Sequence, residues 1–124
     1  MARLFLAIAA LLGALSVAGG AFGAHALKGQ LSESALNSFE TGVRYQMMHA
    51  IALLVVAMLL GQYPDAKLLV PVGWCFVVGI VLFSGSLYGL SLAGIKALGP
   101  VTPLGGVAFI VGWSLLAWSS RGLF

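Results

Sequence analysis

Charged residues divide the chain into four long apolar runs. Counting histidine as neutral, the side chains ionised at neutral pH that bound these runs are Arg3 and Lys28, Arg44 and Asp65, Lys67 and Lys96, and Lys96 and Arg121. Each run approaches or exceeds the roughly 20 residues that a helix needs to cross a hydrocarbon layer about 30 Å thick. Backbone amides in lipid must be paired within their own segment, and four segments are too few to close a β-barrel. We therefore predict an all-α polytopic membrane protein with four transmembrane helices in an antiparallel bundle.

The predicted spans form a single domain over residues 1–124. We place them near residues 4–24, 39–60, 68–90 and 103–119. Turn-forming residues punctuate the second and third connections, namely Gly61, Pro64, Gly94, Gly99 and Pro100. Thr102 followed by Pro103 is typical of a helix start, with Thr102 as the capping residue and Pro103 as the first helical residue. Apolar positions recur every four residues between Gln30 and Thr41, which predicts an interfacial amphipathic turn leading into the second span.

The first span and the orientation each leave an alternative. Arg3, an apolar run and Ala24-His25-Ala26 resemble a signal peptide, but the run exceeds the about 7 to 15 apolar residues of a signal core, which favours a retained span. Three basic residues fall on each side of the membrane, so their count does not decide the orientation. The free amino terminus adds to the side of Arg3 and favours cytoplasmic termini.

Composition agrees with a membrane protein. Hydrophobic residues make up 61% and charged residues 7% of the chain, against roughly half and a quarter in soluble domains. The net charge of +3 comes from single Lys and Arg residues without aromatic interleaving, which argues against a nucleic-acid partner and leaves the lipid bilayer as the first partner. The single cysteine, Cys75, excludes an intramolecular disulfide.

Small residues at four-residue spacing predict close helix packing. The positions that we select for this role are Gly20, Gly23, Gly85, Gly89, Ala108 and Gly112. In lipid, helices associate where small residues let their backbones approach. These faces either pack within the monomer or make a surface for self-association or for docking on a larger membrane complex.

The start of the second span carries a candidate polar site. Its members, together with the histidine at the end of the first span, are His25, Glu40, Arg44, Tyr45, Gln46 and His49. Glu40 precedes Arg44 by one turn, the favourable order for an ion pair. Tyr45 and His49 are also one turn apart, so phenol and imidazole could bond. The cluster is either a hydrogen-bonded clasp between the first two helices or a pocket that handles protons or anions.

Catalytic and metal-binding signatures are missing from the sequence. The three acids, Glu33, Glu40 and Asp65, have no second acid nearby, and no nucleophile is paired with a base. Two histidines 24 positions apart, without a nearby cysteine, are a poor basis for a metal or haem site. We therefore expect no enzymatic activity, no metal and no cofactor.

Several motifs give the chain a family resemblance. They are G-A-F-G-A-H at 20–25, F-E-T-G-V-R-Y-Q at 39–46, F-S-G-S-L-Y at 83–88 and T-P-L-G-G at 102–106. They resemble the YgdD-like (YwdK-like) family of small four-helix inner-membrane proteins of bacteria, a domain of unknown function. The resemblance implies this topology and a multi-pass location in the bacterial inner membrane. It also marks the family pattern at Gly23, His25, Glu40, Arg44, Tyr45, Gln46, His49, Ser84, Ser86, Tyr88, Thr102 and Pro103.

Two functional hypotheses remain open. The first is a structural or accessory membrane protein, either a homo-oligomer or a subunit of a larger membrane complex. The alternative is a small oligomeric transporter or channel that uses the cluster of His25, Glu40, Arg44 and His49. The first span of this chain lacks the intramembrane carboxylate on which small multidrug exporters depend. A transporter of this sequence would therefore have to use that cluster instead.

Overall fold

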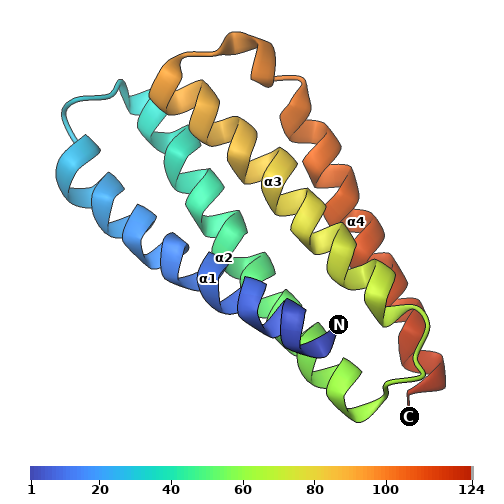
Figure 1. Ribbon diagram of the computed structural model, residues 1–124. Helices are drawn as coiled ribbons and strands as arrows, with labels where there is room; N and C mark the ends of the chain where they lie inside the picture. The colour runs from blue at the N-terminus through green and yellow to red at the C-terminus, as the bar shows by residue number, and fades with distance from the viewer. Residues whose placement is uncertain (124) are drawn as a thin grey trace.

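The computed structural model describes residues 1–123 as an all-α protein with four long helices. They are α1 (Ala2–Phe22), α2 (Glu33–Gln62), α3 (Leu69–Ala93) and α4 (Val101–Ser119), with a π-helical turn at Gly23–Leu27 and 3-10 turns at Lys96–Leu98 and Ser120–Gly122. Successive helices run antiparallel, and both termini lie at the same end of the molecule (Figure 1). All four helices are long and apolar enough to cross a membrane. The predicted fold class is confirmed.

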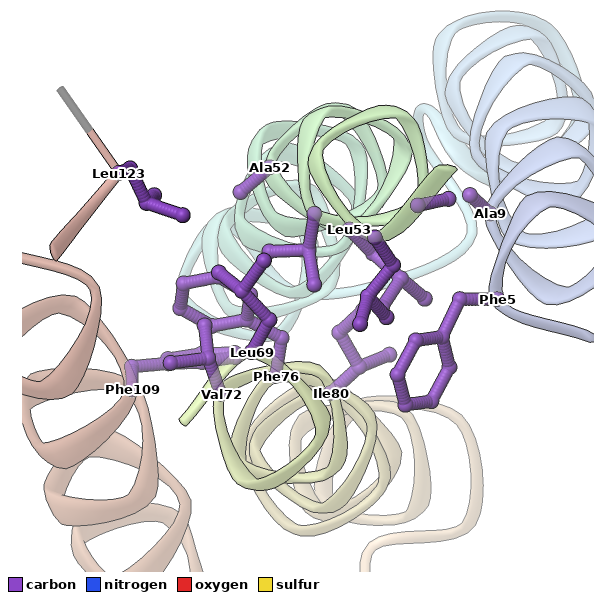
Figure 2. Packing of buried hydrophobic residues seen from close by; sticks show 13 residues of the cluster. Phe5, Ala9, Ala52, Leu53, Leu69, Val72, Phe76, Ile80, Phe109 and Leu123 are labelled. Carbon is purple, nitrogen blue, oxygen red and sulfur yellow. The ribbon is translucent and has the colours of Figure 1, made fainter. Parts of the chain in front are cut away.

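The helices pack mainly on their neighbours in sequence. α2 contacts α1 and α3, and α3 contacts α2 and α4. In the view of Figure 2, α1 and α4 flank the central pair of α2 and α3. Consequently 44% of the most apolar 18-residue stretch of α2, and the same share for α3, is buried. The corresponding share is 17% in each of the segments that contain α1 and α4. The two outer helices therefore present most of their surface to lipid or to another protein.

The apolar core lies between α2 and α3 and is closed by side chains from the outer helices. Leu53 and Val56 of α2 meet Leu69 and Phe76 of α3, and all four are fully buried. Phe5 reaches across from α1 (Figure 2), and its ring meets the Trp74 ring edge-on with 5.5 Å between the centroids. The core thus joins elements that are far apart in sequence.

Glycines in this fold receive aromatic rings from neighbouring helices. A Cβ at Gly42 would lie 2.9 Å from the Tyr88 ring, and one at Gly112 would lie 2.7 Å from the Phe76 ring. Gly73 meets Phe5 and Gly79 meets Phe109 in the same way. A side chain at any of these positions would push two helices apart. Glycine, which has no side chain, therefore permits the close spacing of the helices here.

The predicted packing residues divide between close contacts and open positions. A Cβ at Gly23 would lie 3.0 Å from the Phe39 ring, Gly112 is described above, and Gly89 faces Leu98. Ala108 is half-buried. Gly20 is exposed and a Cβ there would lie 3.8 Å from Val43, whereas a Cβ at Gly85 would meet open space. Gly85 does not pack within the described chain because α3 turns other faces towards its neighbours.

Two helix starts differ from the prediction. α2 begins at Glu33, where the Ser32 side chain accepts a hydrogen bond from the Ala35 amide at 3.1 Å. The segment expected to lie along the membrane surface is therefore the first three turns of a continuous helix. α4 begins at Val101, with Pro100 at its N-cap. Thr102 does not cap the helix because it already lies in the first turn, where its hydroxyl bonds Ser86 of α3.

The outward face of α2 changes from charged to apolar along the helix. Glu40 and Arg44 are exposed on this face, and the next exposed residue one turn on is the apolar Met48. The helix from position 45 to position 62 carries no charged residue and is about 27 Å long at 1.5 Å per residue, close to the thickness of a bilayer core. The charged side chains of this face therefore lie in the first half of α2.

Candidate functional site: an interhelical polar network

The structure separates the six predicted site residues into two groups. Gln46 and His49 are buried and Tyr45 is half-buried, whereas the other three, His25, Glu40 and Arg44, are exposed. Each residue turns an α-helix by about 100°, which puts Glu40 and Arg44 on the opposite side of α2 from Gln46. Only the buried group meets neighbouring helices. The structure does not bring His25, Glu40 or Arg44 together with it.

Gln46 joins α2 to both of its neighbours. Its Nε2 donates a hydrogen bond to the Leu12 carbonyl oxygen of α1 at 2.9 Å. Its Oε1 accepts one from the Tyr88 hydroxyl of α3 at 2.7 Å. The exposed fraction of Gln46 is only 5%, so these partners replace water for both ends of the amide. Gln46 is therefore the one side chain of the network that bonds two helices at once.

Hydroxyl groups on α3 continue the network to α2 and α4. Ser84 donates to the Gly42 carbonyl oxygen of α2 at 2.6 Å. The hydroxyls of Ser86 and Thr102 bond each other between α3 and α4 at 2.6 Å. The close approach of Gly42 to α3 makes the first bond possible, since a larger residue there would hold the backbones apart. Hydrogen bonds therefore link every pair of adjacent helices at this level of the bundle.

His49 connects α2 to α4, its more distant neighbour. Its Nδ1 lies 2.8 Å from the Tyr45 carbonyl oxygen, and its Nε2 lies 3.1 Å from the indole nitrogen of Trp113. A carbonyl oxygen only accepts and an indole N–H only donates, so Nδ1 carries the hydrogen and Nε2 is the acceptor. The imidazole also stacks on the Phe109 ring at 3.5 Å between centroids. Both ring nitrogens of His49 are thus engaged.

The expected bond between the Tyr45 phenol and His49 is not formed. The two rings are stacked, with 6.1 Å between their centroids, and His49 bonds the main-chain carbonyl of Tyr45 instead. One helical turn places the imidazole above that carbonyl, whereas the Tyr45 ring turns towards Phe83 at 4.5 Å. The prediction was correct in pairing these positions and wrong in the atoms that it joined.

The arrangement is a satisfied clasp of neutral groups. Within residues 1–123, every buried side-chain nitrogen and oxygen has a hydrogen-bond partner. The same residues contain no group of three or more His, Cys, Asp or Glu side chains that could hold a metal ion. Interhelical hydrogen bonds of this kind fix how helices sit against each other in lipid. The hydrogen bonds visible at the site therefore join neighbouring helices to one another.

Reasoning from spacing missed several members of the network. Ser84, Ser86, Tyr88 and Thr102 belong to it, and only the family resemblance had pointed to them. Trp113 had no signal at all, because its bond to His49 depends on how α4 crosses α3. Patterns within one helix cannot show which residue of another helix will face them.

A double-mutant cycle tests the bond between Gln46 and Tyr88. We expect Gln46→Leu and Tyr88→Phe each to lower the free energy of unfolding in detergent by about 1 kcal/mol, with a coupling of about 0.6 kcal/mol in the double variant. Ser114→Ala is the control, since its hydroxyl is exposed and bonds only its own helix. Strict additivity of the two substitutions would mean that the bond contributes nothing.

The fold and the network together define a small polytopic membrane protein whose four helices are held by polar contacts between neighbouring helices. Residues 19–106, which include all of α2 and α3, match the family described as "Protein of unknown function (DUF423)". The chain belongs to this family.

Curated relatives agree over nearly the whole length. The UPF0382 membrane protein YwdK of Bacillus subtilis (strain 168) is 46% identical over 114 residues, which is 92% of this chain and 93% of the relative. The UPF0382 membrane protein SAB0533 of Staphylococcus aureus (strain bovine RF122 / ET3-1) is 44% identical and SH2409 of Staphylococcus haemolyticus (strain JCSC1435) 42%, covering 92% and 95% of both chains respectively. No solved structure matches the chain. The predicted family and a multi-pass location in a bacterial membrane are confirmed.

Proposed function

We propose that the protein is an accessory membrane protein that self-associates through the outward face of α1. The observation that carries this proposal is a heptad pattern on that face, in which four exposed alanines, Ala7, Ala10, Ala14 and Ala21, are interrupted only by Val17. They lie opposite the buried face that α1 turns to α2, which contains Phe5 and Ala9. Small residues at this spacing let a second helix approach closely in lipid.

The other outer helix, α4, lacks an outward face of small residues. The outward face of α4 carries bulkier side chains that are at least 42% exposed, at Leu104, Val107, Ile110 and Val111. Such side chains fill the space that a neighbouring backbone would need, and they suit contact with lipid chains. The contrast between two equally unpartnered helices supports α1 as the associating face.

The polar residues also favour an accessory role over transport. A transporter built on His25, Glu40, Arg44 and His49 would need these groups to meet along a path through the bundle. His49 is 4% exposed and bonded at both nitrogens, and the other three side chains are exposed. This placement supports a bundle whose polar groups hold helices together.

Co-isolation of two differently tagged copies in mild detergent and in nanodiscs tests the proposal. We expect Ala14→Leu with Ala21→Leu to weaken association about tenfold, because the larger side chains remove about 1 to 2 kcal/mol of close packing. Ala117→Leu is the matched control, since Ala117 is an exposed alanine on α4. A strictly monomeric protein in both detergent and nanodiscs would refute the proposal, as would equal weakening by the control.

A further inference from the structure

A hollow of about 380 Å³ opens at the end of the molecule that holds both termini. It lies between the α2–α3 connection and the C-terminal turn. Lys67 and Arg121 line it from these two segments, and no Asp or Glu is among its lining residues. Within residues 1–123, neither cation forms an ion pair with another side chain. Two basic groups from distant parts of the sequence thus share one open space.

The C-terminal turn that carries Arg121 is held in a fixed place. Leu123 is 9% exposed and belongs to the apolar core, where Figure 2 shows it beside α4. The guanidinium of Arg121 lies 4.5 Å from the centre of the Trp118 ring, which is a cation–π contact. These two anchors position the guanidinium before any ligand arrives, which lowers the entropy lost on binding.

The start of α3 adds to the positive character of the hollow. Leu68, the N-cap residue of α3, lines the hollow, and the first turn of α3 carries neither an acidic residue nor a side-chain cap. The first turn of α3 itself therefore supplies no negative charge against the positive end of the helix dipole. That positive end supplements Lys67 and Arg121 as an attraction for a negatively charged group.

We propose that this hollow binds the phosphate of an anionic phospholipid headgroup. The position of the hollow matches this ligand, because it lies where α2 ends and α3 begins, at the boundary of two membrane-spanning helices. Trp118, 62% exposed on its rim, is a residue type enriched at membrane interfaces. Leu68 and Leu123 supply an apolar lining beside the two cations, which suits the glycerol and upper acyl chain of a lipid better than a free anion.

Asp65 places a negative charge close to the site. It lines a second hollow of about 300 Å³, which shares Ala66, Gly122 and Leu123 with the first. A carboxylate there repels a phosphate in the main hollow without touching it. Asp65→Asn is therefore expected to strengthen lipid binding by about two- to threefold, a change opposite in sign to loss of a cation.

Native mass spectrometry of protein released from nanodiscs of equal phosphatidylglycerol and phosphatidylcholine measures the retained lipid. We expect the wild-type chain to retain phosphatidylglycerol preferentially. Lys67→Gln and Arg121→Gln should each reduce that preference about fivefold, and the double variant about 30-fold, as expected for about one phosphate interaction per cation. The matched control is Lys28→Gln with Lys96→Gln, which removes two cations from connections at the opposite end of the molecule.

Three outcomes would overturn the proposal. The first is unchanged lipid retention in the double variant, and the second is an equal loss in the control. The third is binding of inorganic phosphate at constant ionic strength without any preference for phosphatidylglycerol over phosphatidylcholine, which would assign the hollow to a free anion. Circular dichroism of each variant checks that the helices are intact, and substitutions at exposed positions such as Lys67 and Arg121 usually change stability by no more than about 0.5 kcal/mol.

Discussion

Replacing Gly105 by alanine should destabilise the protein more than any other addition of a single methyl group. A Cβ at Gly105 would lie only 2.7 Å from both the Cα and the Cβ of Phe83, and closer still to the Phe83 amide nitrogen. The obstacle is backbone of α3, which cannot rotate away as a side chain does. α4 must therefore move off α3, and we expect the free energy of unfolding to fall by about 3 kcal/mol.

The next residue supplies a matched control. Gly106 lies in the same turn of α4, and a Cβ there would find no atom within 4 Å. Gly106→Ala should leave the free energy of unfolding unchanged or raise it by up to about 1 kcal/mol, since alanine favours the helix. Thermal and SDS-induced unfolding of both variants in the same detergent measures the difference. Equal stability of the two would show that α3 and α4 are not in backbone contact at Gly105.

The number and class of the spans could be predicted from sequence because lipid imposes a simple rule. A charged side chain inside hydrocarbon is costly, so uncharged runs of sufficient length mark the helices. Helix ends were harder to place. α2 begins six residues before the predicted start at 39, because Ser32 caps it and its first turns are amphipathic rather than apolar. Hydropathy finds the part of a helix inside lipid and not the turns that continue into the headgroups.

The candidate site was predicted in part. Tyr45, Gln46 and His49 form bonds or stacks with their neighbours, as their clustering suggested. Glu40 and Arg44 were grouped with them because they are close in sequence, but they occupy the outward face of α2. Sequence spacing gives the relative angles of residues on one helix and does not give the direction of the neighbouring helix.

Close contacts between helices are harder to predict from the sequence than the search for small residues at four-residue spacing assumes. Gly42, Gly73 and Gly79 each receive a ring from another helix, and none is among the six small residues selected from the sequence. A glycine that accommodates one aromatic side chain needs no second small residue on its own helix. The partner ring belongs to a distant part of the chain, so no local pattern records the contact.

His49 is the second position where we expect a large effect. His49→Ala removes the ring that stacks on Phe109 and leaves the Trp113 indole N–H without its acceptor. A buried ring replaced by alanine leaves a cavity, and the unpaired donor adds its own cost, so the free energy of unfolding should fall by about 2 to 4 kcal/mol. Met48→Ala is the control, because the neighbouring Met48 is 44% exposed and faces outwards.

Trp113 distinguishes the hydrogen bond from simple packing. If the indole N–H donates to His49, Trp113→Phe should cost about 1 kcal/mol in the wild-type chain and markedly less in the His49→Ala background, where the acceptor is already gone. His49→Gln should recover part of the loss, since an amide can again accept from the indole. The same loss from Trp113→Phe in both backgrounds would reduce His49 to a packed ring and would remove the link between α2 and α4 from the polar network.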